Sequence, residues 1–186
     1  KNNPDVIVIV DEAYIDFGGE TALPLIDKYD NLVVVRTFSK SRSMAGLRIG
    51  YAISNPELIK ALNDVKYSYN SYTMNRPSLV LGVESIHDDA YFREKVGQII
   101  ATRERFVKEI AELGFTCLPS SANFVFATHE SIPAKEIFAA AKENNIYVRY
   151  FDKPRIDNYL RISIGTDAEM DAFVAFLKGY VETKQN

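Results

Sequence analysis

The chain has 186 residues, of which 47% are hydrophobic and 25% charged, with a formal net charge of −3. This balance is typical of a soluble globular protein, and it excludes a protein whose surface is dominated by a basic, nucleic-acid-binding stripe. The single cysteine, Cys117, excludes a disulfide framework and a cysteine-rich metal site. Its apolar neighbours predict a buried, inert thiol.

Two features of the chain bear on its location and completeness. The apolar runs are too short to span a bilayer and no signal peptide is visible, so we expect a cytoplasmic enzyme. The chain has no initiator methionine and reaches an apolar run, 6–10, almost at once. We therefore expect a fragment that lacks the front of its fold.

The first half of the sequence predicts an α/β sheet. The β-branched runs 6–10 and 32–35 each predict a strand that is buried on both faces, as in a parallel sheet. The segment 23–29 would form the crossover between them. A third strand is expected over 47–53, and the loop before it is too short for a helical crossover, so it should run antiparallel.

Helices follow this sheet. Asn55 and Pro56 predict the start of a helix that reaches about Val65, because asparagine caps helices and proline suits their first turn. Further helices are expected over 77–87 and 90–113. The remainder predicts an α+β pattern, with strands over 116–118, 123–127, 146–150 and 160–164 and helices over 133–143 and 167–181.

The predicted fold class is thus α/β, with a mostly parallel sheet that carries one antiparallel strand, followed by a small α+β domain. We expect residues 1–89 to be the remnant of a large, cofactor-binding domain. Residues 90–186 would form a long connecting helix and the small C-terminal domain.

Residues with chemical potential follow the predicted strands. Asp11 ends the first strand, the segment 37–40 (Thr-Phe-Ser-Lys) follows the second, and Arg48 lies at the start of the third. In open α/β sheets, ligands bind beyond the carboxyl ends of the strands. A carboxylate, a lysine, an arginine and hydroxyls at one edge suit an anionic, phosphorylated cofactor with a basic ring nitrogen.

These motifs are similar to those of the fold-type I aminotransferases, which depend on pyridoxal 5′-phosphate (PLP). Within that group the chain resembles the histidinol-phosphate aminotransferases most. The resemblance covers essentially the whole chain but only the C-terminal part of that fold. The matching stretches are 10–14 (VDEAY), 37–40 (TFSK), 45–51 (AGLRIGY), 121–125 (SANFV) and 160–166 (LRISIGT).

The resemblance implies a role for each matching residue. Lys40 would bind PLP covalently through its amine and then carry a proton during catalysis. Asp11 would pair with the pyridine nitrogen, and Tyr14 would donate a hydrogen bond to the ring oxygen. The cofactor phosphate would be held by Arg48, Ser39 and Thr37.

The C-terminal part would contribute to the substrate site. By resemblance, Arg161 would bind the glutamate carboxylate and the phosphate end of histidinol phosphate. Arg149, on a neighbouring predicted strand, could assist, although a salt bridge is an equally good interpretation. The implied reaction exchanges an amino group between histidinol phosphate and 2-oxoglutarate in histidine biosynthesis. The implied assembly is a homodimer whose subunits complete each other's sites, so these 186 residues alone should be inactive.

Several alternatives remain open from the sequence alone. Asp11-Glu12 after an apolar strand also resembles the Walker B element of a P-loop nucleotide hydrolase, although no glycine-rich phosphate loop is present. An aromatic amino-acid transaminase or a threonine-phosphate decarboxylase would share the PLP fold. A non-catalytic remnant that only packs is a third possibility. His87 and His129 lie in polar stretches that we expect to be exposed, and no spacing suggests a metal site.

Overall fold

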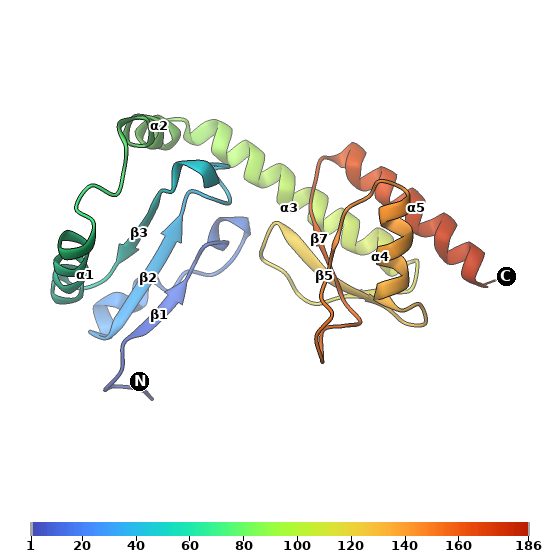
Figure 1. Cartoon of the computed structure of the whole chain (residues 1–186), viewed down its shortest axis with the longest axis horizontal. Coiled ribbons are helices and arrows are strands. Elements are labelled where there is room, and N and C mark those ends of the chain that lie inside the picture. The colour runs from blue at the N-terminus through green and yellow to red at the C-terminus, as the bar shows by residue number, and fades with distance from the viewer. Residues whose placement is uncertain (1, 186) are drawn as a thin grey trace. The chain divides into compact units, whose positions relative to one another are not determined.

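The computed structural model describes residues 2–185, which form two compact units (Figure 1). The division falls between Glu94 and Lys95, inside the helix α3 (Asp89–Ala111). The residues before this division are called the N-terminal unit, and those after it the C-terminal unit. Each unit has its own sheet and its own packed side chains.

The N-terminal unit contains a three-stranded sheet in the order β1-β2-β3. Strand β1 (Val8–Asp11) pairs in parallel with β2 (Leu32–Thr37), and β2 pairs antiparallel with β3 (Gly50–Ile53). Both expected strand directions are therefore confirmed. The crossover from β1 to β2 contains only two short 3-10 helices, η1 (Ile15–Phe17) and η2 (Leu23–Lys28).

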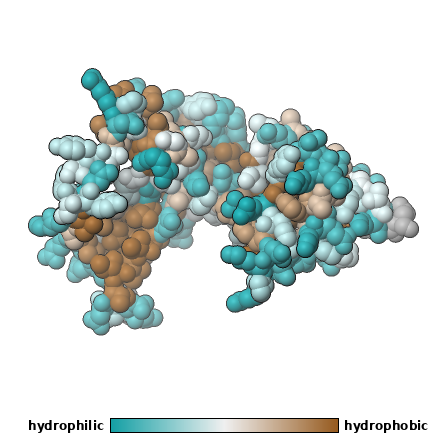
Figure 2. Space-filling model, in the orientation of Figure 1, coloured by the Kyte–Doolittle hydropathy of each residue, from teal (hydrophilic) through white to brown (hydrophobic). Residues whose placement is uncertain are grey.

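Strand β1 differs from the expected strand in its burial. The sequence predicted a strand buried on both faces, but Ile7 is 59% exposed and Ile9 is 64% exposed. The reason is that β1 lies at the edge of the described sheet, so one side has no neighbouring strand. Figure 2 shows the resulting hydrophobic surface over β1 and β2.

The segment before β3 also differs from the expected strand over 47–53. Residues Ala45–Leu47 form a 3-10 helix, η3, and the strand begins only at Gly50. Arg48 follows η3 with a left-handed backbone, φ 56° and ψ 41°, which breaks the extended conformation. An apolar pattern alone does not reveal such a turn, because it depends on one residue's φ angle.

The helices of the N-terminal unit are α1 (Pro56–Tyr69) and α2 (Arg76–His87), and α3 begins there. The predicted cap is confirmed, since the side chain of Asn55 accepts a hydrogen bond of 2.9 Å from the amide of Leu58. Asn75 caps α2 in the same way. Within α2, large apolar side chains are about half exposed: Leu79, Val80, Leu81, Val83 and Ile86.

The C-terminal unit packs an antiparallel sheet in the order β4-β5-β7-β6. Its strands are β4 (Phe115–Cys117), β5 (Phe124–His129), β6 (Arg149–Tyr150) and β7 (Leu160–Ser163). The helices α4 (Ala134–Glu143) and α5 (Asp167–Gln185) join α3 in covering its core. The core includes the fully buried side chains Phe106, Ile110, Val125, Ile137, Leu160 and Leu177.

His129 is part of this packed interior, so its expected exposure is wrong. It is only 3% exposed, and its Nδ1 accepts hydrogen bonds of 3.1 Å from the amides of Ser131 and Ile132. Its Nε2 lies 2.9 Å from the carbonyl oxygen of Leu113 and therefore donates to it. The polar residues that flank His129 in the chain gave no sign of this burial. Its ring connects the chain at Leu113 with the turn at Ser131 and Ile132.

Candidate active site

The carboxyl edge of the β1–β2 pair gathers most of the predicted site. Asp11 is the last residue of β1 and is in register with Val35, two positions before Thr37 at the end of β2. Thr37 in turn pairs with Gly50, the first residue of β3. Arg48 lies just before Gly50, so the structure brings all three predicted segments to one edge of the sheet.

Lys40 lies beside Tyr14 at this edge. The Nζ atom of Lys40 is 5.3 Å from the centroid of the Tyr14 ring, and the lysine side chain is exposed. An amide-to-carbonyl bond of 3.0 Å from Ser43 to Lys40 closes the turn that carries the lysine. A second bond of 3.0 Å, from the amide of Phe38 to the carbonyl of Ile49, ties this turn to the chain before β3.

Asp11 and the two hydroxyls are held by short-range hydrogen bonds. The carboxylate of Asp11 is exposed and accepts one bond of 2.9 Å from the amide of Ala13. Thr37 Oγ1 accepts a bond of 3.0 Å from the amide of Ser39 and lies 2.8 Å from Ser39 Oγ. These contacts order the segment between β2 and Lys40 while leaving the carboxylate accessible.

Arg48 occupies a backbone conformation that is uncommon for a residue with a side chain. A left-handed conformation costs such a residue about 1–2 kcal/mol. Its Nη1 donates a hydrogen bond of 3.0 Å to the carbonyl of Ala45, and the side chain is otherwise exposed. Strain of this kind is tolerated where the position of a side chain matters, which agrees with a binding role for this guanidinium.

A buried ion pair beneath this edge was not identified from the sequence. Glu12, 6% exposed, accepts hydrogen bonds from Arg36 Nη2 at 2.8 Å and from Nε at 3.0 Å. Burial acts to raise the pKa of Glu12, but the bonds from the amide of Ala22, from Arg36 and from Thr21 outweigh it and lower the pKa. Burial acts to lower the pKa of Arg36, and Glu12 and Tyr51 raise it above its usual value. The available signal was strand alternation, which turns Glu12 and Arg36 away from Asp11 and Thr37.

Arg42 anchors the lysine turn from its other side. Its guanidinium carbon lies 4.0 Å from the centroid of the Phe92 ring and 5.3 Å from that of Phe38, and its Nη1 donates to the carbonyl of Ser85. A cation between two aromatic rings and a carbonyl is a fixed structural element. Arg42 therefore connects the lysine turn to α2 and to the start of α3.

Arg161 and Arg149 belong to the C-terminal unit. They are directly opposite each other in the β6–β7 pair, and both are exposed. Each guanidinium packs near an aromatic ring, with 5.3 Å from Arg161 to Phe124 and 5.4 Å from Arg149 to Phe151. Like charges opposite each other destabilise a sheet, and a bound anion would offset that repulsion. Neither arginine has a salt bridge to a carboxylate recorded among the described residues.

Cys117 is partly buried rather than fully buried as expected, and it lines a pocket with Arg103 and Glu104. Burial raises the pKa of its thiol to about 11, so it is protonated at neutral pH. The expectation of an inert thiol agrees with this environment. Within residues 2–185, no helix is both long and apolar enough to cross a membrane.

The chain belongs to the aminotransferase class I and II family, whose model matches residues 1–177. It is 52% identical over 178 residues to a histidinol-phosphate aminotransferase of Brachyspira hyodysenteriae, an alignment that covers 95% of this chain and 50% of that protein. This family membership rules out the P-loop nucleotide hydrolase, and with it the Walker B interpretation of Asp11-Glu12.

Solved structures show the same fold. The histidinol-phosphate aminotransferase of Clostridium acetobutylicum superposes with a TM-score of 0.86 and 27% identity, over 95% of this chain and 55% of that one. The enzyme of Sinorhizobium meliloti in complex with PLP gives a TM-score of 0.80 and 28% identity, over 95% of this chain and 49% of that one. The expected fold class is confirmed. The chain spans about half the length of the curated relatives it matches.

Proposed function

We propose that this chain is the C-terminal part of a PLP-dependent aminotransferase. In its full-length form, it would convert histidinol phosphate and 2-oxoglutarate to imidazole-acetol phosphate and glutamate in histidine biosynthesis. The observation that carries the proposal is the meeting of Lys40, Tyr14, Asp11 and Arg48 at one sheet edge. About half of all residues are identical to those of histidinol-phosphate aminotransferases, which supports the choice of substrate.

The groups at this edge fit PLP by their chemistry. An exposed primary amine, that of Lys40, can react with an aldehyde, and the accessible carboxylate of Asp11 can pair with a basic ring nitrogen. A phenol near the lysine can donate a hydrogen bond to a ring oxygen. A guanidinium and two hydroxyls are the donors that proteins use for phosphate. Asp11 is the one acidic side chain among these groups, and it is assigned to the ring nitrogen rather than to the phosphate.

Each residue then has a defined task in the reaction. PLP, when bound, supplies an electron sink for the charge that develops at the substrate's α-carbon. Asp11 holds a proton on the ring nitrogen, which strengthens that sink. Lys40 Nζ would hold the cofactor and would carry the proton that leaves the substrate's α-carbon. Tyr14 orients the ring oxygen.

The remaining cofactor contacts fix the phosphate. Arg48 would bind it through charge-assisted bonds, with Ser39 and Thr37 as hydroxyl donors. A phosphate held by these three residues would fix the position of the cofactor relative to Lys40. The left-handed backbone of Arg48 would aim its guanidinium at that point.

The substrate anion would be bound in the C-terminal unit. Arg161 is assigned to the carboxylate of glutamate and to the phosphate of histidinol phosphate, with Arg149 opposite it as a second cation. Two neighbouring guanidinium groups suit a doubly charged phosphate, because each can donate two hydrogen bonds.

The proposal extends to domain roles and assembly. Residues 1–89 would form part of the cofactor domain and residues 90–186 the connecting helix and small domain, in a cytoplasmic homodimer. The exposed apolar surface of β1 and α2 supports the view that these elements are covered in the whole protein. We expect the 186-residue chain alone to bind PLP weakly and to show no turnover.

The cofactor assignment is tested by covalent mapping on the full-length protein. PLP is added, the visible absorbance of the bound cofactor is recorded, and borohydride reduction is followed by peptide mass spectrometry. We expect the label on Lys40. A label on any other lysine, or no label, would refute the assignment.

The substrate assignment is tested by half-reactions. The rate of amino transfer to the bound cofactor is compared for histidinol phosphate, phenylalanine and threonine phosphate, with carbon dioxide release measured for the last. We expect histidinol phosphate to react fastest. Faster conversion of phenylalanine would point to an aromatic transaminase, and carbon dioxide release would point to a decarboxylase.

A further inference from the structure

The cluster around the buried Glu12 joins the segments that carry the groups assigned to the cofactor. The Thr21 hydroxyl lies 2.9 Å from both carboxylate oxygens of Glu12, and the Ala22 amide donates to Oε1 at 2.6 Å. Arg36 Nη2 donates to Glu12 at 2.8 Å and to Thr21 Oγ1 at 2.9 Å. Among the described residues, every buried side-chain polar atom has a hydrogen-bond partner, and this includes the buried polar atoms of this cluster.

Two residues of the cluster are direct chain neighbours of proposed site residues. Glu12 directly follows Asp11, and its amide donates a bond of 2.8 Å to the carbonyl of Val35. Arg36 directly precedes Thr37, the start of the segment that leads to Lys40. The ion pair therefore joins the neighbour of Asp11, the proposed ligand of the ring nitrogen, to the neighbour of Thr37, where the segment leading to Lys40 begins.

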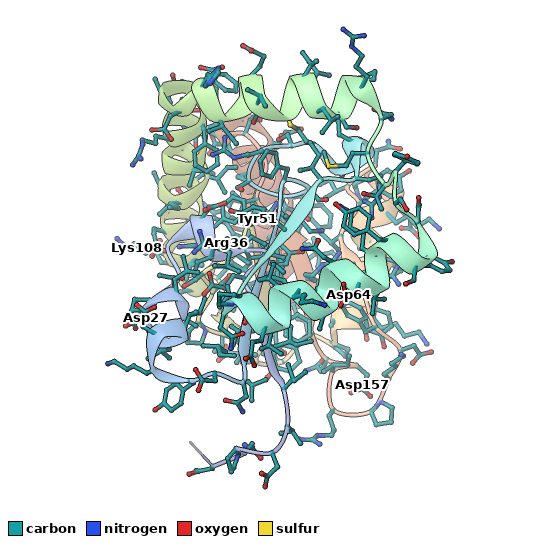
Figure 3. All side chains as sticks on the ribbon, turned by 90° about the vertical axis from the view of Figure 1, so that its left-hand side faces the viewer. Asp27, Arg36, Tyr51, Asp64, Lys108 and Asp157 are labelled. Atoms are coloured by element: carbon teal, nitrogen blue, oxygen red, sulfur yellow. The ribbon has the colours of Figure 1, made fainter. Side chains whose placement is uncertain are left out.

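Arg36 also reaches the third segment. It is in register with Tyr51 on β3, and Figure 3 shows the two side chains next to each other on the sheet. Tyr51 is therefore the cross-strand neighbour of Arg36, and it acts to raise the pKa of that guanidinium. Tyr51 is three residues after Arg48, so Arg36 binds Glu12 at the end of β1 and lies beside the start of β3.

We propose that Glu12 and Arg36 are positioning residues that hold Asp11, the Lys40 segment and Arg48 at the spacing PLP requires. The proposal rests on the function proposed above. Glu12 is buried and Arg36 is partly buried, so displacing either partner would leave the other charge without its hydrogen bonds in a poorly solvated place. Alternation along β1 and β2 turns the pair away from the face of Asp11 and Thr37, so it acts through those neighbours.

The experiment measures PLP affinity in the full-length protein by titration of the cofactor's visible absorbance. Glu12→Gln keeps the shape of the side chain but removes the charge, and we expect the dissociation constant of PLP to rise about tenfold or more, as small misplacements of site groups commonly cause. Arg36→Lys keeps the charge but loses the two-pronged contact, and it should weaken binding by a smaller factor. In both, borohydride at saturating PLP should still label Lys40.

A matched control separates positioning from general stability. Val33→Ala truncates a side chain that is 4% exposed, on the same strand as Arg36 but away from the carboxyl edge. We expect it to lower the melting temperature of the cofactor-free protein at least as much as Glu12→Gln does, without changing PLP affinity. Equal weakening of PLP binding in Val33→Ala and Glu12→Gln would overturn the positioning role.

Coupling of the two residues is the second criterion. The double variant Glu12→Gln with Arg36→Lys should weaken PLP binding no more than the worse single variant, because both changes break one unit. Additive losses would contradict the proposal, as would unchanged affinity in both single variants. Failure of the unmodified protein to bind PLP would instead refute the proposed function itself, and this inference with it.

Discussion

The two units of this chain differ in how far they bury their apolar side chains and in where their ion pairs lie. The C-terminal unit buries a continuous core between its sheet and helices, and at its surface Arg105 forms ion pairs with Glu109, Asp167 and Asp171. The buried Arg103 pairs with the exposed Glu104. The N-terminal unit leaves one strand and one helix with exposed apolar side chains, and its ion pair between the buried Glu12 and the partly buried Arg36 joins the ends of two neighbouring strands.

This difference shows that the two units are stabilised by different kinds of contact. The C-terminal unit stabilises itself and presents two arginines on an otherwise regular sheet. The N-terminal unit leaves more of its apolar surface exposed, and the ion pair between Glu12 and Arg36 lies beside the sheet edge that carries Lys40. If the proposed positioning role is right, the geometry of the site depends on this small polar cluster.

The largest expected effect is on the lysine of the N-terminal unit. In the full-length protein, Lys40→Ala should slow amino transfer by about 100-fold or more, because a positioned general base contributes about 100- to 10,000-fold to such steps. Single-turnover kinetics with histidinol phosphate would measure this rate. Lys60→Ala, which removes an exposed lysine paired only with Asp64 on α1, is the control that should leave the rate unchanged.

The core of the C-terminal unit provides the next contrast. Leu177→Ala removes a fully buried side chain, and we expect it to lower the free energy of unfolding by about 2–5 kcal/mol. Ile9→Thr, at a position that is 64% exposed, should change the stability of this chain by no more than about 0.5 kcal/mol. Urea unfolding of the 186-residue chain measures both values. A large loss on Ile9→Thr would mean that β1 is covered in solution.

A smaller, more selective effect is expected for the substrate arginine. Arg161→Met should raise KM for 2-oxoglutarate by about tenfold or more, because it removes a charge-assisted contact to the carboxylate. PLP affinity should be unchanged, since the proposed cofactor ligands all lie in the N-terminal unit. Steady-state kinetics and a PLP titration on the same preparation separate the two properties. A loss of PLP binding would show that Arg161 has a different role.

The smallest expected effect concerns pH and contrasts the two kinds of ion pair. The pKa of Glu12 is lowered from its usual 4.5 by its hydrogen bonds, so the stability it adds is present above pH 4.5 and is lost as the pH falls through its folded-state value. Asp167 also has a lowered pKa, through its bonds from Arg105 and Thr102, but it is exposed.

Salt distinguishes these two contributions. Melting temperatures measured against pH should show a flatter acid limb for Glu12→Gln at both low and high salt, because a buried pair is poorly screened. Asp167→Asn should flatten the curve only at low salt. Equal salt sensitivity of the two variants would contradict the difference in burial.

Much of the site could be located from the sequence because its segments end predictable strands. The β-branched runs before Asp11 and Thr37 predicted a parallel pair, and the short loop before β3 predicted its antiparallel direction. These features are local, since they depend on residue type and loop length. The edge at which Asp11, Lys40 and Arg48 meet followed from strand direction alone.

Other features could not be predicted because they depend on contacts between distant residues. His129 packs against Phe115 across the β4–β5 pair and bonds to Leu113, 16 positions away, and neither contact is visible in its polar neighbourhood. The partnership of Glu12 with Arg36 joins residues 24 positions apart. The exposure of β1 reflects its place at the edge of the sheet, which no local pattern encodes.

The sequence by itself determined the α/β class, the strand directions and the set of groups suited to a PLP site, because periodicity and spacing are local properties of the chain. Only the tertiary structure decided which charges are paired, which apolar faces are covered, and that Arg48 adopts a left-handed backbone. Those outcomes follow from packing between segments far apart in the chain. Lys40 was identified from its motif, but the cluster proposed to position it became visible only in the folded molecule.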